Sequence, residues 1–332
     1  MFISLRNVVI IAFAIGILSS LGFVANVSSQ EAEDASSLVD GSIAPPYRTF
    51  EAFKSTVFVV PNFLPTELAI KWRDEMRRIW ENTRPIRDGD ETTTCDTGTE
   101  HDTFLFATNN DGAYRERHSN EKVRSLEKMG ARGVIARLTQ QYGQFSYSKW
   151  ELHPNHRLVK EMEEAFSTGI KNTVTDLLKA NHTNIELSSH LSDLFVTLYS
   201  TGNFLSPHDD GVSGSWAFVV SLMDGPPGQE WNPADFGGGL QFECPLSAAT
   251  VRTSFATIEW CETVYPTFNS AVIFQTRVPG GDTGPMHQVL PVNAKAESEG
   301  FYRFGLTGWY MDASDEMDEE AERQRDMMRA RD

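Results

Sequence analysis

The sequence predicts an α+β protein in which helices in the first half support a β-sandwich or jelly roll in the second half. Two patterns lead to this prediction. Apolar residues recur at helical spacing in two segments before residue 180, and six short strand-like runs, separated by Gly, Pro and Asp, follow Ser188. No helical pattern lies between these runs, which argues against a parallel sheet with crossover helices.

The composition of the chain excludes two broad classes of protein. The 332 residues include 29 Lys and Arg against 46 Asp and Glu, which gives a formal net charge of −17. Nucleic-acid binding needs a clustered basic surface, and the sequence contains no Lys/Arg-rich run. Hydrophobic residues make up 40% of the chain, enough for a full core, so wholesale disorder is excluded as well.

The N-terminal segment predicts translocation of the rest of the chain. An apolar run over 8–25 follows the single basic residue Arg6, and acidic residues follow the run, so the charge bias keeps the N-terminus cytosolic. Residues 1–29 therefore form a signal peptide or a signal anchor, and both readings stay open. We expect a place in the secretory pathway: the ER or Golgi lumen, with or without a single type II membrane span, or secretion. Sequons at Asn26 and Asn181 fit a glycoprotein.

The next segments predict a linker and a helical support region. Residues 30–49 are small, polar and acidic, as in a flexible linker, and the folded body is expected from Phe50. Within 50–190 we expect one helix after Pro65, a long polar loop region over 88–120 with room for one strand at 104–107, and a second helix over 157–178. The charged tail over 312–332 predicts a solvated or partly disordered terminal helix.

The core is expected over 191–311, where the strand-like runs occur. These runs are 194–199, 216–223, 239–243, 271–275, 287–292 and 301–311. The three cysteines allow at most one disulfide within the chain. Cys244 and Cys261 are the favoured pair because they flank one connection between predicted strands, but a pair of reduced thiols remains open, and Cys95 is left over.

One motif carries metal chemistry. In the run from Tyr199 to Asp210, His208 and Asp210 are two residues apart, so on an extended strand both side chains point to the same side while Asp209 points away. His287 follows about 80 residues later in the sequence Pro-Met-His-Gln-Val. Two imidazoles and one carboxylate on one side of a metal leave the opposite positions open, which is the geometry of non-haem Fe(II) oxygenases.

The surrounding motifs follow the same order as in a known family. They are Tyr-x-x-Gly-x-Phe-Leu-x-x-His-x-Asp over 199–210, Gly-Gly-Gly-Leu over 237–240, His-Gln-Val over 287–289, and Arg-Phe-Gly-Leu-Thr-Gly-Trp-Tyr over 303–310. Together, over about 193–311, they resemble the 2-oxoglutarate- and Fe(II)-dependent dioxygenases of the prolyl 4-hydroxylase type.

This resemblance implies a double-stranded β-helix (jelly roll) core and a complete set of site residues. Fe(II) would be held by His208, Asp210 and His287, with 2-oxoglutarate and O2 as cosubstrates and ascorbate as an expected reductant. Arg303 would bind the distal carboxylate of 2-oxoglutarate, with Tyr199 and Thr307 as hydroxyl donors. No catalytic residue is expected beyond the metal site.

The spacing of Arg303 departs from the family pattern. The family usually places its basic residue closer to the second histidine, whereas here residues 293–300 intervene, which we interpret as a longer hairpin loop. Arg277 is a more distant substitute.

By the same resemblance, the chain hydroxylates a protein side chain, with peptidyl-proline as the first candidate, and converts 2-oxoglutarate to succinate and CO2. Hydroxylation of lysine or of a small molecule is the alternative enzyme reading, and a non-catalytic jelly-roll binding protein is the alternative from another class. The expected partner is a peptide or protein substrate that can contain proline. No nucleic acid is expected, and a membrane is expected only through an N-terminal anchor.

Overall fold

The computed structural model describes residues 47–83, 102–109, 146–181, 185–210, 213–245, 258–278 and 282–312. The predicted signal segment, residues 30–46 of the predicted linker, Cys95 and the tail beyond Asp312 lie outside these ranges. Within these ranges, no helix has both the length and the apolar character needed to cross a membrane.

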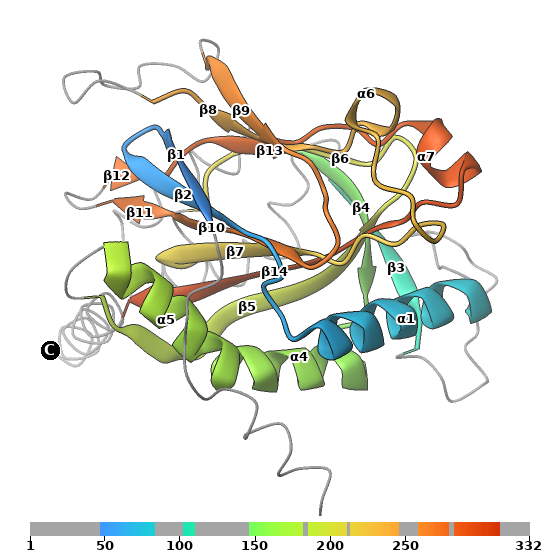
Figure 1. The fold of residues 1–332 in the computed structure, drawn as a ribbon, viewed down its shortest axis with the longest axis horizontal. Helices are drawn as coiled ribbons and strands as arrows, with labels where there is room; N and C mark the ends of the chain where they lie inside the picture. The colour runs from blue at the N-terminus through green and yellow to red at the C-terminus, as the bar shows by residue number, and fades with distance from the viewer. Residues whose placement is uncertain are drawn as a thin grey trace, which may run out of the picture. The chain divides into compact units, whose positions relative to one another are not determined.

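The main sheet joins neighbouring antiparallel strands in one continuous path, β1-β2-β10-β7-β14-β5-β4-β6-β13-β8-β9, with β3 added to β4 (Figure 1). Its strands are β1 (Arg48–Ala52), β2 (Ser55–Val60), β3 (Phe104–Asn109), β4 (Tyr147–Leu152), β5 (Leu187–Tyr199), β6 (Phe204–His208), β7 (Trp216–Ser221), β8 (Leu240–Glu243), β9 (Trp260–Val264), β10 (Ser270–Gln275), β13 (His287–Val289) and β14 (Arg303–Asp312). A separate pair comprises β11 (Arg277–Val278) and β12 (Asp282–Thr283).

The path folds back on itself, so that two sheets face each other. The larger sheet contains β10, β7, β14 and β5, the smaller one contains β6, β13, β8 and β9, and β4 joins them by pairing with both β5 and β6. Phe242 from the smaller sheet contacts Phe274 from the larger one, with ring centroids 5.1 Å apart. This arrangement is the predicted jelly roll, a nearly closed antiparallel barrel.

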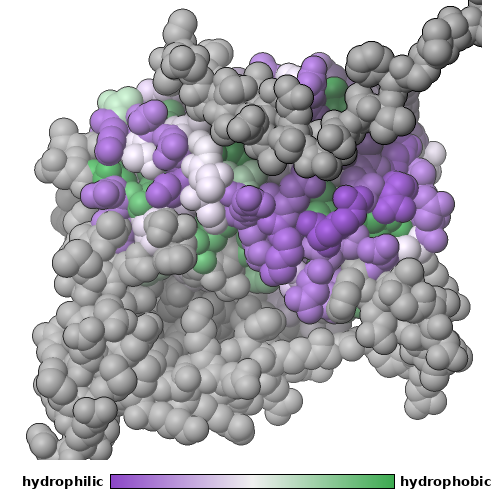
Figure 2. Space-filling view, turned by 90° about the horizontal axis from the view of Figure 1, so that it is seen from below, coloured by the Kyte–Doolittle hydropathy of each residue, from purple (hydrophilic) through white to green (hydrophobic). Residues whose placement is uncertain are grey.

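Helices cover the outer face of the larger sheet (Figure 1). They are α1 (Thr66–Asn82), α4 (Arg157–Ser167) and α5 (Gly169–Asn181), and two short helices, α6 (Pro233–Phe236) and α7 (Ala294–Ser298), lie near the ends of strands. Phe166 of α4 stacks on Phe218 of β7, with centroids 4.5 Å apart, and on Trp72 of α1. Figure 2 shows the side of the molecule that carries these helices, where hydrophilic side chains gather, as expected for amphipathic helices.

The second predicted helix is two helices, which corrects the expectation of one helix over 157–178. The chain breaks at Thr168, whose φ of −119° and ψ of −101° are not helical, and α5 starts at Gly169 and continues to Asn181. A β-branched residue followed by glycine has low helix propensity, which explains the break. Apolar residues continue at helical spacing on both sides of the break, so the sequence pattern alone did not reveal it.

The strands differ from the predicted runs mainly at their ends. β5 begins seven residues earlier than the run predicted from Leu194, and β13 ends at Val289, because Pro291 follows and lacks the backbone N–H needed to extend a ladder. The predicted strand at 104–107 is β3. β1 begins at Arg48, two residues inside the predicted linker. The predicted support region therefore contributes strands β2, β3 and β4 as well as helices.

Alternation along the strands of the larger sheet decides which residues reach the interior between the sheets. On β14, Phe304, Leu306 and Tyr310 pack in the core beneath the helices, whereas Trp309 packs in the second core, between the sheets. On β4, Trp150 belongs to the core beneath the helices. The residues that alternate with the helix-side positions face the smaller sheet; they are Arg303, Gly305 and Thr307 on β14, Phe195, Thr197 and Tyr199 on β5, and Tyr147, Lys149 and Glu151 on β4.

The disulfide predicted between Cys244 and Cys261 is present, so the alternative of two reduced thiols is wrong. It links Cys244, the residue directly after β8, to Cys261 within β9.

Candidate metal and cosubstrate site

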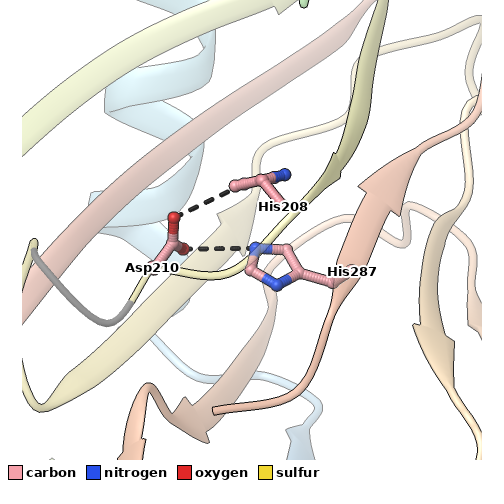
Figure 3. A group of neighbouring side chains, drawn as sticks. All are labelled: His208, Asp210 and His287. Atoms are coloured by element: carbon pink, nitrogen blue, oxygen red, sulfur yellow. Dashed lines mark ion pairs between the residues drawn. The ribbon is translucent and has the colours of Figure 1, made fainter. Parts of the chain in front are cut away.

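Three side chains with metal-binding groups meet on the inner side of the smaller sheet (Figure 3). His208 ends β6 and His287 begins β13, and the two residues are direct partners in the register of these strands. Asp210 lies two residues beyond β6. One ligand atom from each residue lies within 4.8 Å of the others, and all three residues are buried. The structure thus brings together the three predicted metal ligands, with Asp210 rather than Asp209 as the carboxylate.

Each histidine is oriented by a backbone carbonyl two residues before it. Nδ1 of His208 lies 2.8 Å from the carbonyl oxygen of Ser206, and Nδ1 of His287 lies 3.1 Å from that of Pro285. Because a carbonyl only accepts hydrogen bonds, each Nδ1 carries a proton and donates it, and in the neutral ring the lone pair lies on Nε2.

The two Nε2 atoms face the Asp210 carboxylate. The distances are 3.4 Å from His208 Nε2 to Oδ1 and 3.2 Å from His287 Nε2 to Oδ2 (Figure 3). Lone pairs of neutral imidazoles and of a carboxylate repel one another at this separation, so the arrangement needs a cation among them. An additional proton on one imidazole would provide this positive charge, and a divalent metal ion would provide it to all three ligands at once.

Electrostatics keep the Asp210 carboxylate ionised. Burial alone would raise the pKa of Asp210, but His287 and His208 together hold it well below its ordinary value. For His287, burial lowers the pKa, and the nearby Asp210 carboxylate outweighs this effect and raises it. The site therefore presents a buried negative charge toward two imidazole nitrogens, as a cation site requires.

Packing fixes the His287 ring. Phe242, its cross-strand partner on β8, stacks on it at a centroid distance of 5.8 Å, and Phe274 from the opposite sheet contacts it at 4.8 Å. The residue before it, Met286, donates its backbone N–H to Glu243 Oε1 at 2.8 Å and accepts from the backbone N–H of Glu243 at 3.0 Å. The ligand geometry is thus held by the sheet and does not depend on a loop alone.

Arg303 and Tyr199 lie side by side on the larger sheet, facing the interior. They are direct partners in the register of β14 and β5, and the guanidinium carbon of Arg303 lies 4.6 Å from the centre of the Tyr199 ring. Arg303 Nε donates to the carbonyl of Gly238 at 2.7 Å. A Cβ on Gly238 would stand 3.1 Å from Arg303 Cδ, so this glycine, at a φ of +68°, lets the backbone approach the arginine.

Arg303 is a buried cation without a carboxylate partner among the described residues. Only 7% of it is exposed, and burial lowers its pKa, with no acidic side chain among the groups that act on it. Burying a charge in this way is costly unless a partner neutralises it. The distal carboxylate of a bound 2-oxoglutarate is a partner with the right charge and shape for a planar guanidinium.

Tyr199 is suited to donate a hydrogen bond at the same place. Burial raises its pKa, Lys149 and Arg303 act to lower it, and Glu151 and Asp210 act to raise it further. The phenol therefore keeps its proton at neutral pH. Thr307 also faces the interior, where it pairs with Phe195 and Val219 in the register, and its role as a third donor stays a prediction. The side chain of Arg277, the substitute for Arg303, lies outside those that the structure describes.

Sequence reasoning did not single out three further polar residues on the interior face. Lys149 and Glu151 on β4 form an ion pair at 2.8 Å. Ser221 on β7 pairs with Gly305 in the register, and its buried Oγ has no hydrogen-bond partner in the part of the chain that the structure describes. Their inward orientation depends on the pairing of β4 with β5 and of β7 with β14, which joins segments far apart in the sequence. Alternation along each strand is the one signal that the sequence offers for them.

Comparison with known proteins agrees with this site. Residues 194–311 match the model of the 2OG-Fe(II) oxygenase superfamily. Among matching solved structures is a prolyl-4-hydroxylase from Pseudomonas putida, 17% identical, with 77% of this chain and 92% of that chain covered and a TM-score of 0.39. No curated protein matches the chain. The segment that builds the site is thus similar in sequence to the 2OG-Fe(II) oxygenase superfamily, and its two histidines and one aspartate suit the Fe(II) of that family.

Proposed function

We propose that the protein is a 2-oxoglutarate- and Fe(II)-dependent dioxygenase that hydroxylates a side chain of a peptide or protein substrate, with peptidyl-proline as the first candidate. The observation that supports it most is that two complementary groups share one interior. Two histidines and an aspartate lie on the smaller sheet, and the larger sheet carries the buried guanidinium of Arg303, which has no carboxylate partner among the described residues. When bound, Fe(II), 2-oxoglutarate and O2 supply the oxidation: one oxygen atom enters a substrate C–H bond, the other enters succinate, and CO2 is released.

The residues of the chain hold and orient these groups. His208, Asp210 and His287 would hold Fe(II) and leave its remaining positions to the cosubstrates. Arg303 and Tyr199 would hold the distal carboxylate of 2-oxoglutarate, with Thr307 as a further donor. The distal carboxylate would thus lie against the larger sheet, and the keto-acid end would point toward the three ligands on the smaller sheet. No separate acid–base residue is required.

The proline part of the proposal rests on the motif order over 193–311, which resembles that of prolyl 4-hydroxylases. The net charge of −17 suits basic or neutral peptides better than acidic ones or nucleic acid. An enzyme that acts on lysine or on a small molecule would have the same metal site. These alternatives are therefore distinguished by measuring which substrate is oxidised.

We also propose a location in the secretory pathway. The Cys244–Cys261 disulfide fits an oxidising compartment, as does the apolar N-terminal segment. Asn181, in the second sequon, is exposed at the end of α5, where a glycan could attach. A membrane contact is proposed only through the N-terminal segment, and ascorbate is proposed as the reductant that keeps the iron ferrous.

The test is turnover with defined substrates. The full-length protein is incubated with Fe(II), 2-oxoglutarate, O2 and ascorbate, together with blocked peptides that contain proline or lysine, or with free amino acids. We expect succinate formation to rise with proline peptides, and the peptide to gain one oxygen atom by mass spectrometry. Oxidation of lysine peptides or free amino acids instead would contradict the proline proposal and leave the enzyme class intact.

A further inference from the structure

One buried hydrogen-bond donor on the inner face of the larger sheet has no acceptor among the described residues. Trp309 on β14 is 7% exposed, and its Nε1 is buried without a hydrogen-bond partner in these ranges. The indole packs in the core between the sheets, with its ring centroid 5.8 Å from that of Phe195. An indole N–H can only donate, and a buried donor that stays unpaired costs free energy. A ligand that enters the interior is the natural source of an acceptor.

Three other buried tryptophans in the described ranges do have an acceptor for their N–H. Their Nε1 atoms lie 2.8–3.1 Å from an oxygen of the chain, which is ordinary for a hydrogen bond. The chain thus pairs buried indole donors elsewhere, and Trp309 differs from them. The three pairs are Trp72 with Glu161, Trp150 with Ser200, and Trp231 with the carbonyl of Gly237.

Trp309 lies at the level of the metal ligands along the strands. In the register of the larger sheet it pairs with Ala217 of β7, and Ala217 pairs with Phe274 of β10. All three side chains belong to the core between the sheets. Phe274 contacts His287 across the interior, with ring centroids 4.8 Å apart. Trp309 is therefore two strand spacings, about 10 Å, from the residue that touches a metal ligand.

The cosubstrate is too short to reach this donor from Arg303. Arg303 and Trp309 are six residues apart on β14, which is about 20 Å along the strand. Their ring neighbours on β5, Tyr199 and Phe195, are four residues apart, about 13 Å. A five-carbon diacid with C–C bonds of about 1.5 Å spans only about 8 Å. With its distal carboxylate at Arg303, 2-oxoglutarate ends short of Trp309, so the acceptor belongs to the substrate that is oxidised.

The surroundings of the donor favour an uncharged acceptor. The indole is neutral and packs among aromatic and aliphatic side chains. The Lys149 ammonium beside Phe195 is paired with Glu151 at 2.8 Å, so this ion pair adds no net charge. A carboxylate at Trp309 would lose hydration that one neutral donor cannot replace, whereas an amide carbonyl loses much less. Amide carbonyls flank every residue of a peptide, but a free amino acid offers a carboxylate instead.

We propose that Trp309 Nε1 donates a hydrogen bond to a main-chain carbonyl oxygen of the peptide substrate, next to the residue that is hydroxylated. The Phe195 and Trp309 rings provide the apolar contact for the same part of the peptide. This inference rests on the proposed function and deepens it, because it names the group of the substrate that the chain recognises and favours peptides over free amino acids.

The experiment removes the donor from the protein and the acceptor from the peptide separately. The full-length wild type is compared with Trp309→Phe and with protein in which 3-benzothienylalanine, an isostere with sulfur in place of the N–H, replaces Trp309. Trp80→Phe removes an indole that packs on Phe104 and Trp150 beneath the helices and serves as the control. The probes are an N-acetylated, C-amidated peptide with one proline and two analogues, with a thioamide in place of the carbonyl of the proline or of the residue before it.

Peptide dissociation constants are measured by calorimetry without O2, in the presence of Fe(II) and 2-oxoglutarate. We expect the wild type and Trp80→Phe to bind one thioamide peptide about fivefold or more weakly than the parent peptide, the size of one neutral hydrogen bond. Both Trp309 replacements should bind the parent and that thioamide peptide equally weakly. The 2-oxoglutarate dependence of the charge-transfer band should be the same in all four proteins. The isostere keeps the shape of the indole, so it gives the answer even if Trp309→Phe is unstable.

Two outcomes overturn the inference, and they differ in what they leave standing. If the isostere protein binds the parent peptide as tightly as the wild type, or if the thioamide peptides lose the same affinity in both, the N–H does not bind the substrate, and peptide hydroxylation stands. If the wild type neither binds nor oxidises the capped peptides, both this inference and the peptide part of the proposed function fail. A normal charge-transfer band would in that case still support a 2-oxoglutarate-dependent dioxygenase with another substrate.

Discussion

The two proposed metal-binding histidines are oriented by the same local hydrogen bond. In each, Nδ1 donates to the backbone carbonyl two residues earlier, Ser206 for His208 and Pro285 for His287. This contact fixes both the tautomer and the direction of the ring before any metal binds. The carboxylate of Asp210 then meets two preoriented Nε2 atoms, so little reorganisation is needed when a cation enters.

Among single residues, Arg303 is predicted to control the affinity for 2-oxoglutarate but not the affinity for the metal. Replacing Arg303 with Met removes the buried guanidinium while keeping an unbranched apolar side chain of comparable length. We expect the dissociation constant of 2-oxoglutarate to rise about 10- to 100-fold, which corresponds to about 1.5–3 kcal/mol for a hydrogen bond to a charged group. Anaerobic titration of the Fe(II)-loaded protein with 2-oxoglutarate measures it.

Two control variants make the Arg303 result specific. Arg78→Met removes an arginine from the exposed side of α1 and should leave the titration unchanged. Arg303→Lys keeps the charge but loses the planar fork, and we expect an intermediate affinity. Wild-type 2-oxoglutarate affinity in Arg303→Met would mean that another residue binds the distal carboxylate.

Sequence reasoning identified the site residues that belong to local motifs and missed those that depend on strand pairing. His208 and Asp210 are two residues apart, so alternation along an extended chain was sufficient to select Asp210 over Asp209. Arg303 could be assigned only through resemblance, since its proximity to Tyr199 follows from the pairing of β14 with β5. Lys149 and Ser221 carry no motif, so only the folded sheet shows that they face inward.

At the scale of elements, the strands around the site were more predictable than their ends. The run from Leu194 was visible from its alternation, but the seven preceding residues of β5 are polar in part and became strand through pairing with β14. The break between α4 and α5 at Thr168 is a local event that the helical periodicity conceals. Pairing with β14 sets the start of β5, whereas low local helix propensity sets the break at Thr168.

The start of α4 is predicted to make the fold sensitive to mild acid. His156 is the N-cap of this helix: its Nδ1 accepts from the backbone N–H of Leu158 at 3.0 Å, and its Nε2 lies 2.9 Å from Oδ1 of Asp102. Burial lowers the pKa of His156, and the Asp102 carboxylate offsets this only in part. The folded state therefore prefers the neutral ring, which can accept the capping hydrogen bond.

The sign of the effect follows from that lowered pKa. Above the ordinary pKa of histidine, about 6.5, His156 is neutral in both states and the cap contributes fully. As the pH falls from there toward the lower folded pKa, the unfolded chain takes up the proton first, so stability is lost. His156→Asn keeps a capping acceptor but cannot titrate, so we expect its melting temperature to fall less than that of the wild type between pH 7.5 and 5. Equal losses in the two proteins would contradict this role.

At the scale of the whole molecule, the described residues form two hydrophobic cores, one on each face of the larger sheet. One core lies between the helices and the larger sheet and contains Trp72, Phe166 and Phe218. The other lies between the two sheets and contains Phe242, Phe274 and Trp309, next to the metal site. The larger sheet is thus supported from outside by helices, which leaves its inner face free to carry the polar residues of the site.

The disulfide is predicted to stabilise the smaller sheet as a whole. Cys244 and Cys261 are 17 residues apart in the sequence, and closing a loop of this size restricts the unfolded chain by about 3 kcal/mol. Replacing both cysteines with alanine should lower the free energy of unfolding by about this amount in urea titrations, and a reducing agent should have the same effect on the wild type. An unchanged free energy of unfolding would show that the bridge carries no stability.

The most direct test of the account is whether the three ligands and Arg303 form one working site. The full-length protein is titrated anaerobically with Fe(II) and 2-oxoglutarate while the visible charge-transfer band of the chelate is recorded. We predict a band in the wild type that requires both components, its loss in His208→Ala, and its retention in His153→Ala, which removes a histidine that contacts the backbone N–H of Asn155. A folded wild-type protein without the band, or an equal band in His208→Ala, would contradict the proposed metal site.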